Sequence, residues 1–444
     1  ARDARFDGLF FVAVSSTGIF CRPICPARVP AEKHVRYFFS ATSASAAGYR
    51  PCLRCRPDSA PGSAAWSGSQ TTFNRALKLI DDGALQQHSQ AQLSERLGIT
   101  ERYLRKLFQQ HLGLAPKHYA LIQQVLFAKK LLHETSLPIA DIAFQAGFNS
   151  VRRFNDAFKK QLQLNPASIR RRAAQSSAII ELVLSYRPPL DWHSMLSFWQ
   201  ARTLTGVDWV SNNSFGRTFN FHQQAGWFEV EPSTENSLTL RLYWPGKQGL
   251  FMLIQQIRRL LDLDANMTQI EQQLAVHPLF QQRFIPGLRI PGLWCQWEAG
   301  VRAVLGQQVS VAGARTQLNR LVDALGQEIA PGKKLFPSPE AVAASDLQMI
   351  KVPQARRDTL HALASFVQAS PNASPELWQS IKGIGPWTIN YARMRGLSDT
   401  DIWLGGDLGV QKALAKSNSV NKASDTLAPW RSYATLQLWF SLGD

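Results

Sequence analysis

The segment IKGIGPWTINY (381–391) decides how the C-terminal part of this chain is organised, together with the segment DIWLGGDLGVQKAL (401–414) that follows it. Gly383 and Gly385 allow a tight turn between two helices, and the backbone amides of such a turn can approach a phosphate closely. Asp407 then lies in a glycine-rich turn that opens the next segment of helical apolar periodicity. A Gly-x-Gly pair alone is typical of ordinary turns. The combination of this turn with the carboxylate downstream is much more specific for a functional site.

The two segments resemble the helix-hairpin-helix of base-excision DNA glycosylases and the catalytic aspartate that follows it. Three further stretches resemble the AlkA family of bacterial 3-methyladenine DNA glycosylases: YRPPLDWHSMLSF (186–198), PGLRIPGLWCQWEAGVRAVLGQQVS (286–310) and PWRSYATLQLWF (429–440). The resemblance covers essentially all of residues 179–444. It implies an antiparallel β-rich subdomain at 179–250, packed on an all-α helix-hairpin-helix glycosylase core at 251–444.

The AlkA resemblance assigns roles to one carboxylate and four aromatic side chains. A purine alkylated at N3 or N7 is already a good leaving group, so one carboxylate, Asp407, is enough to stabilise the oxocarbenium-like sugar and assist water. The base must be flipped out of the duplex and held by stacking. The aromatic residues that match pocket positions are Phe198, Trp387, Tyr391 and Trp439. The alternative for each of them is an ordinary place in the core.

Residues in and near the hairpin match family positions that bind DNA. Gly383, Gly385 and Thr388 are expected to bind the DNA backbone, and the resemblance implies a monovalent cation held by hairpin carbonyls. Gln308 occupies the position of the apolar wedge that fills the gap left by the flipped base. A glutamine can insert there, but the energetics of flipping change with it.

Two absences narrow the expected chemistry. Glycosylases that also cleave the DNA backbone use a hairpin lysine as a Schiff-base nucleophile. Trp387 occupies that position here, which predicts hydrolysis without lyase activity. No cysteine follows Cys295 in the sequence, so no iron–sulfur cluster is expected after the hairpin.

Composition and charge indicate a polyanionic partner. The chain has 444 residues, long enough for about three domains, and a net charge of +17. Residues 1–180 carry 25 Lys and Arg against 11 Asp and Glu, whereas the rest carries 24 against 21. Apolar runs fall short of the roughly 20 residues that span a bilayer, and no signal peptide is visible. We therefore expect a cytoplasmic, nucleoid-associated bacterial protein that binds DNA and no membrane.

Four of the five cysteines lie within one short N-terminal window. Cys21 and Cys25 are separated by three residues, Cys52 and Cys55 by two, and a loop joins the pairs. Paired thiolates at this spacing suit tetrahedral zinc. Two disulfides are the alternative, but they are typical of secreted domains. A structural zinc knuckle that merely touches DNA would also fit the cysteines alone.

The two sequence segments around these cysteines resemble the N-terminal domain of the Ada family of methylation-response regulators. They are FVAVSSTGIFCRPIC (11–25) and GYRPCLRCRP (48–57). The resemblance, over residues 1–60, implies zinc held by four cysteines and a methyl group taken by Cys21 from a methyl phosphotriester in DNA. Thr17, Arg28 and Arg54 match family positions that face the DNA backbone. Methylation would remove a negative charge beside phosphates and so raise the affinity for DNA.

An internal repeat follows between residues 71 and 173. The segments AQLSERLGITERYLRKLF (91–108) and ADIAFQAGFNSVRRFNDAF (140–158) each read as a short helix, a glycine turn and a second helix opened by a polar N-cap, Thr100 or Asn149. They resemble the AraC-type domain with two helix-turn-helix units. The arginines expected at DNA are Arg102, Arg105, Arg152 and Arg153. A plain helical bundle with solvated arginines is the alternative.

The expected protein combines these parts, with linkers at 59–69 and 170–177. It is multidomain and mostly α-helical, and strands are predicted at 179–186, 227–231 and 237–243 from alternation of apolar and polar residues. Its function would be methyl-phosphotriester sensing coupled to transcription activation, plus excision of alkylated bases. The expected partners are alkylated and promoter DNA and RNA polymerase, with a monomeric chain. The alternative is a methylation-sensing regulator whose glycosylase-like domain is not catalytic.

Overall fold

The computed structural model describes residues 10–38, 41–55, 57, 69–170, 178–281, 283–416 and 426–442. The chain divides into two compact units, Ala1–Ala120 and Leu121–Asp444. Most of both predicted linkers, 59–68 and 171–177, lies outside the described residues. No helix in the described ranges is long and apolar enough to cross a membrane.

The first unit begins with a small sheet beside the four cysteines. The sheet has the strand order β3-β1-β2-β4 and buries Phe11, Ala13, Phe20 and Ala44 on one side. Strands β1 and β2 form a hairpin in which Val12 pairs with Cys21, so the first cysteine ends a strand. The elements are β1 (Phe11–Val14), β2 (Ile19–Cys21), η2 (Glu32–His34), β3 (Val35–Phe38), α1 (Ala41–Ala46) and β4 (Arg50–Pro51).

The first unit continues with one helix-turn-helix. Its helices are α3 (Ser69–Asp81), α4 (Ala84–Gln87), α5 (Gln90–Leu97) and α6 (Glu101–Leu112). Ser89 opens α5 with a capping box that uses Gln92, and Gly98 ends it in the left-handed conformation that favours glycine. Leu93, Leu104 and Phe108 pack in its core. Helix α7 (Pro116–Glu134) begins in this unit and ends in the second.

The second helix-turn-helix shares a hydrophobic core with the predicted β-rich subdomain. It consists of the later part of α7, α8 (Ile139–Gln145), α9 (Val151–Leu162) and η3 (Pro166–Ile169). One apolar cluster joins Phe154 and Phe158 of α9 to Leu182 and Leu240 of the sheet. The ring of Phe127 lies edge-on to that of Phe251, with centroids 5.2 Å apart.

Polar contacts fix the same interface. The buried side chain of Gln145 donates to the carbonyl of Gly246 at 2.6 Å and accepts from the amide of Leu250 at 3.2 Å. The Glu134 carboxylate accepts from the amide of Val183 at 2.9 Å, and Lys130 donates to the carbonyl of the same residue. Residues about 50 and 100 positions apart thus hold the helix-turn-helix to the sheet.

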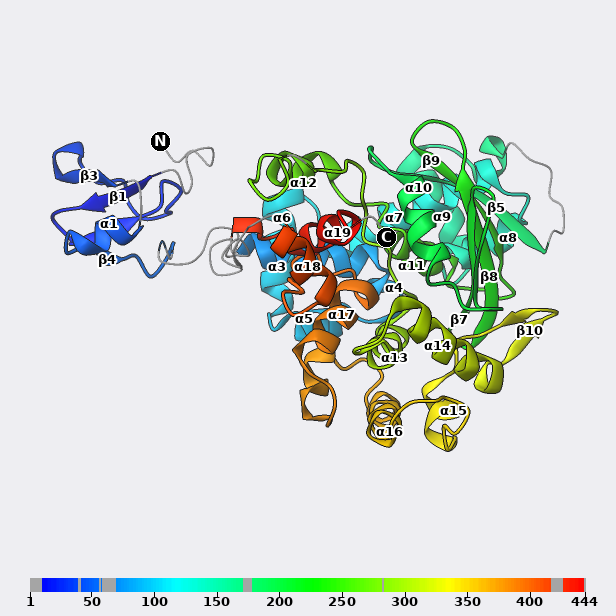
Figure 1. Ribbon diagram of the computed structural model, residues 1–444. Helices are drawn as coiled ribbons and strands as arrows, with labels where there is room; N and C mark the ends of the chain where they lie inside the picture. The colour runs from blue at the N-terminus through cyan, green and yellow to red at the C-terminus, as the bar shows by residue number, and fades with distance from the viewer. Residues whose placement is uncertain are drawn as a thin grey trace. The chain divides into compact units, whose positions relative to one another are not determined.

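The five-stranded antiparallel sheet has the order β5-β9-β8-β7-β6. Its strands are β5 (Ile179–Ser185), β6 (Asp208–Ser211), β7 (Ser214–Phe221), β8 (Gln224–Pro232) and β9 (Ser237–Tyr243), so the three predicted strands are confirmed. Strands β6 and β7 were not predicted, because six consecutive residues of β7 are buried and show no alternation. Helices α10 (Trp192–Gln200) and α11 (Leu250–Leu260) lie beside the sheet (Figure 1) and share its core.

The remainder of the second unit is helical apart from the short hairpin of β10 (Glu328–Ala330) and β11 (Lys333–Lys334). Its elements are α12 (Met267–Leu274), α13 (Gln296–Gly306), α14 (Val311–Leu325), α15 (Pro339–Ala344), α16 (Gln354–Ala369), η4 (Pro375–Ser380), α17 (Pro386–Gly396), α18 (Leu408–Lys416) and α19 (Arg431–Phe440). Helix α13 is central, since every residue from Trp297 to Leu305 is buried. The fold class predicted from the sequence is therefore confirmed.

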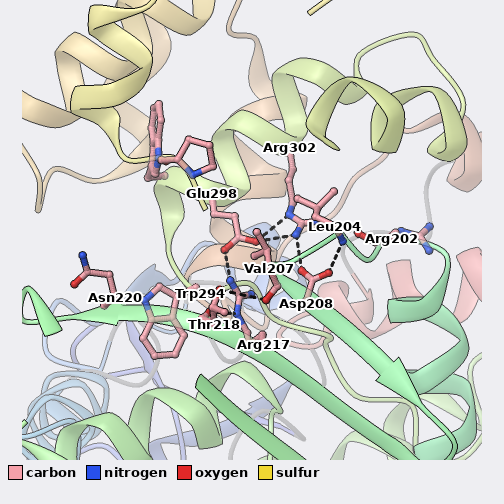
Figure 2. A network of polar contacts seen from close by, with 12 residues as sticks. Arg202, Leu204, Val207, Asp208, Arg217, Thr218, Asn220, Trp294, Glu298 and Arg302 are labelled. Carbon is pink, nitrogen blue, oxygen red and sulfur yellow. Dashed lines mark hydrogen bonds and ion pairs between the residues drawn. The ribbon is translucent and has the colours of Figure 1, made fainter. Parts of the chain in front are cut away.

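A buried ionic network ties α13 to the sheet (Figure 2). Glu298 accepts from Arg217 at 2.8 Å and from Arg302 at 2.9 Å, and Arg302 also binds Asp208 at 2.8 Å. Burial alone would raise the pKa of Glu298, but the two arginines outweigh it and lower that pKa, so Glu298 is ionised. The network fixes the orientation of α13 against β6 and β7.

Replacement of Gln145 by alanine should destabilise the second unit by about 2–4 kcal/mol, because a buried amide and a partly buried carbonyl lose their partner. Urea denaturation followed by tryptophan fluorescence measures this unit, since 12 of the 13 tryptophans follow residue 178. The control is Gln272→Ala at an exposed position of α12, where we expect a change within about 0.5 kcal/mol. Equal midpoints for both variants would contradict the shared interface.

Candidate functional site

Asp407 lies at the N-terminus of α18, and four N–H groups are directed at its carboxylate. Oδ1 accepts from the amides of Gly409 at 2.9 Å and Val410 at 3.2 Å, which is an N-cap arrangement. The indole of Trp439 also donates to Oδ1, at 2.9 Å, and that of Trp387 donates to Oδ2 at 3.1 Å. These donors and the positive end of the helix dipole stabilise the negative charge on a partly buried side chain.

Space for a side chain at Gly409, beside this carboxylate, is tight. A Cβ on Gly409 would lie 3.0 Å from Asp407 Oδ1 and 3.1 Å from Trp439 Cδ1. The side chain of the neighbouring Leu408 is 64% exposed. Asp407, at the end of the loop before α18, lies between the indoles of Trp387 and Trp439.

The four aromatic residues predicted for the base pocket converge on Asp407 from three helices. Trp387 and Tyr391 of α17 are stacked with centroids 5.4 Å apart, and Phe198 of α10 is stacked on Trp439 of α19 at 6.2 Å. Trp387, Tyr391 and Trp439 are partly exposed, whereas Phe198 is buried. Phe198 thus supports Trp439 from behind.

Two arginines that sequence reasoning missed lie against these rings. The guanidinium carbon of Arg202 lies 3.7 Å from the centroid of Phe198, and that of Arg395 lies 4.8 Å from it. Arg395 is buried, which lowers its pKa, and it donates to the hydroxyl of Tyr391 at 2.9 Å. The sequence signal for both was a spacing of four residues, between Phe198 and Arg202 and between Tyr391 and Arg395.

The hairpin turn between η4 and α17 has the conformation that its glycines predict. Gly383 has φ 91°, and a Cβ there would lie 2.2 Å from Thr359 Oγ1, so both the backbone and the packing require glycine. Gly385 precedes Pro386, the first residue of α17. Thr388 is 1% exposed, and its hydroxyl accepts from Gln307 at 3.1 Å.

The loop between α13 and α14 carries the predicted wedge. Gln308 is exposed and has φ 57°, and Ser310 caps α14 by accepting from the amide of Gly313 at 3.1 Å. Val309 and Val311 on either side of Ser310 are also exposed. The loop therefore presents one glutamine and two apolar side chains to the surface.

The four cysteines near the N-terminus form one cluster. Their sulfur atoms lie within 4.8 Å of one another; Cys21 is half-buried, whereas Cys25, Cys52 and Cys55 are buried. The hydrogen bond with Cys55 and then burial raise the pKa of the Cys21 thiol, while the same bond lowers the pKa of Cys55 to about 6. Four sulfur atoms this close together fit a bound dication, and the donor set and spacing match zinc.

The predicted DNA-facing residues of the cysteine domain are exposed, namely Thr17, Arg28 and Arg54. The backbone amide of Arg22 donates to the sulfur of Cys55 at 3.3 Å, and its side chain is buried.

The recognition helices of both helix-turn-helix units expose the predicted arginines. Arg102 and Arg105 are exposed on α6, and Arg152 and Arg153 on α9. Thr100 caps α6 as predicted. The prediction of Asn149 as the second N-cap is wrong by one residue, because Ser150 accepts from the amide of Arg153 at 3.3 Å.

Comparisons with known proteins agree with these parts. Models of three families match the chain: the metal binding domain of Ada at residues 1–58, a helix-turn-helix domain at 93–172 and the AlkA N-terminal domain at 181–295. A probable bifunctional transcriptional activator/DNA repair enzyme AlkA of Mycobacterium tuberculosis is 36% identical over all of this chain and 95% of its own length. DNA-3-methyladenine glycosylase 2 of Escherichia coli is 30% identical over 59% of this chain and 97% of its own length. The bifunctional transcriptional activator/DNA repair enzyme Ada of Escherichia coli is 35% identical over 30% and 35% of the two chains.

The fold and the sites define a multidomain DNA-repair protein with a cysteine metal centre, helix-turn-helix units and a glycosylase-like domain. The likeness to the mycobacterial protein extends over the whole chain. This chain belongs to the family of bifunctional transcriptional activator/DNA repair enzymes that join Ada-type and AlkA-type domains.

We expect the purified chain to hold one zinc ion, measured by elemental analysis. Cys52→Ser should lose most of that zinc, because one thiolate of a four-sulfur site is replaced by a hydroxyl. The control is Cys295→Ser, since Cys295 lies on the other unit. Equal zinc in the two variants would exclude the four-cysteine site.

Proposed function

We propose that the C-terminal domain hydrolyses the N-glycosidic bond of alkylated purines of the 3-methyladenine type, with Asp407 as its catalytic residue. The observation that carries this proposal is the carboxylate of Asp407, held by two amides and two indoles beside stacked aromatic rings. A cationic base stacks favourably on electron-rich rings such as Trp387 and Trp439. The same rings orient the carboxylate at the sugar.

The proposed reaction needs no acid on the leaving group. The bond between the sugar and the alkylated base breaks first, and its electrons neutralise the cationic base. Asp407 stabilises the positive charge that develops on the sugar and accepts a proton from the attacking water. Trp387 stands where a lyase would have its lysine, so the proposed product is an abasic site in an uncleaved strand.

The hairpin and the α13–α14 loop, which carries Gln308, are proposed to hold the DNA duplex while the nucleotide is flipped out. The exposed turn at Gly383 and the N-terminus of α17 offer backbone amides to a phosphate, and hairpin carbonyls would bind a monovalent cation. Gln308, exposed on its loop, would enter the space that the flipped nucleotide leaves.

For the N-terminal domain we propose methyl transfer from a DNA methyl phosphotriester to Cys21. The half-buried position of Cys21 among three buried cysteines supports this choice. Bound zinc would keep the sulfurs deprotonated at neutral pH. Cys21 Sγ forms a bond to the methyl carbon as the carbon–oxygen bond breaks, and the electron pair stays on the phosphate oxygen as a diester. The thioether has no route back, so each chain acts once.

Methylation would also act as a switch. It removes one negative charge from a surface that carries the exposed Arg28 and Arg54, so the affinity for phosphates rises. The helix-turn-helix arginines of α6 and α9 would then bind promoter DNA. We propose that the chain acts as a monomer and activates transcription through RNA polymerase.

The substitution Asp407→Asn should lower base release from methylated duplex DNA at least about a hundredfold. Asparagine still caps α18, so the fold is kept while the charge is lost. Chromatography of the released bases measures the effect, and Asp346→Asn, which changes an exposed carboxylate of the same domain, is the control. If the unchanged protein binds DNA but releases no base, the regulator with a non-catalytic domain takes the place of this proposal.

After incubation with DNA that contains methyl phosphotriesters, we expect a single methyl group on the peptide that contains Cys21, detected by mass spectrometry. Cys21→Ala should abolish the transfer, whereas Cys295→Ser should not change it. Methyl groups on Cys25, Cys52 or Cys55 instead would contradict the assignment of Cys21 as acceptor.

A further inference from the structure

Gln307 precedes the predicted wedge residue, is partly buried and contacts the hairpin. Its side-chain Nε2 donates to the carbonyl of Gly383 at 3.0 Å and to the hydroxyl of Thr388 at 3.1 Å. An amide nitrogen carries two hydrogens, so both donors are used in one bridge. The bridge joins the α13–α14 loop to the turn and the first residues of α17.

Helix α16 holds both sides of this bridge. Arg356 donates to the backbone carbonyl of Gln307 at 3.0 Å, and the hydroxyl of Thr359 lies 3.0 Å from the carbonyl of Lys382. The hairpin turn packs on Thr359 so closely that only glycine fits at 383. Loop and hairpin are thus connected directly by Gln307 and indirectly through α16.

The backbone separates the two adjacent glutamines of the loop. Gln307 ends α13 with an extended conformation, φ −60° and ψ 124°, whereas Gln308 has φ 57° and is exposed. The left-handed conformation at Gln308 costs about 1 kcal/mol or more unless its neighbours hold it. The Gln307 bridge on one side and the Ser310 cap on the other provide that hold.

We propose that Gln307 is a positioning residue for base flipping, because it fixes the α13–α14 loop, which carries Gln308, to the hairpin. The distance between the hairpin turn, which would bind the DNA backbone, and Gln308, which would enter the base stack, then stays constant. The inference rests on the proposed glycosylase function. Gln307 acts through Gln308 and the hairpin and does not touch the reacting atoms. Rotation of a nucleotide out of a paired stack requires contacts at both the DNA backbone and the base stack. A loosely held Gln308 would move back out of the stack.

The test compares two duplexes that differ only in the base opposite a single 7-methylguanine, either cytosine or adenine. Gln307→Met keeps the length of the side chain and removes both donors. We expect kcat/KM to fall roughly 10- to 100-fold for the paired lesion, and only a few-fold for the mispaired lesion, which costs less to unstack. Gln348→Met, at an exposed position of the same domain, is the control and should change neither rate.

A double substitution separates the bridge from general weakening of the fold. Thr388→Val removes the second acceptor while keeping the shape of a buried side chain. If both residues act through one contact, the double variant should lose less than the product of the two single losses. Thermal denaturation midpoints are measured for all variants, and kcat/KM is compared at a temperature well below the lowest of them, so that the losses report on the bridge and not on unfolding.

Equal losses on the paired and mispaired lesions, or no loss on either, would overturn the positioning role of Gln307. An unchanged protein that releases 7-methylguanine from neither duplex would instead refute the glycosylase function on which the inference rests.

Discussion

The cap at the start of α18 is the interaction on which the C-terminal site depends. Asp407 caps the N-terminus of the helix by accepting hydrogen bonds from the amides of Gly409 and Val410. The same carboxylate accepts hydrogen bonds from the indoles of Trp387 and Trp439. A carboxylate with so many donors costs little to keep charged away from bulk water. The Asp407 side chain caps a helix at the end of a loop and accepts hydrogen bonds from two indoles, and these contacts together fix its position. Structural and chemical demands coincide at this residue.

The sequence identified the participants of this site but not their contacts. The glycine turn and Asp407 are local patterns, and they predict a hairpin and a capped helix without knowledge of the rest of the chain. Whether an indole N–H is directed at a carboxylate depends on how α17, α18 and α19 pack, which no local pattern contains. Gln307 illustrates the same limit, since its partners Gly383 and Thr388 are about 80 residues away.

Buried charge is a second feature that the sequence conceals. Glu298 and Arg302 are four residues apart, a spacing that is typical of a solvated helix face. In the structure both are buried and bound to Arg217 and Asp208 on the sheet. A buried ion pair adds little net stability, because desolvation offsets the attraction. What it does supply is orientation: it fixes how α13 lies against the sheet, and Gln307 directly follows α13.

The charge distribution of the chain fits what each part is proposed to bind. The Ada-type and helix-turn-helix parts are proposed to bind phosphates through side-chain cations, and residues 1–180 carry the excess of Lys and Arg. The proposed substrate, an alkylated base, is itself a cation, so unpaired arginines that line the proposed pocket would repel it. Arg395 lies behind Phe198 and Tyr391 and is buried, so rings separate its charge from the partly exposed faces of Trp387 and Trp439. The near-neutral balance after residue 180 is compatible with the proposed site, which would bind a cationic base by stacking and a phosphate by backbone amides.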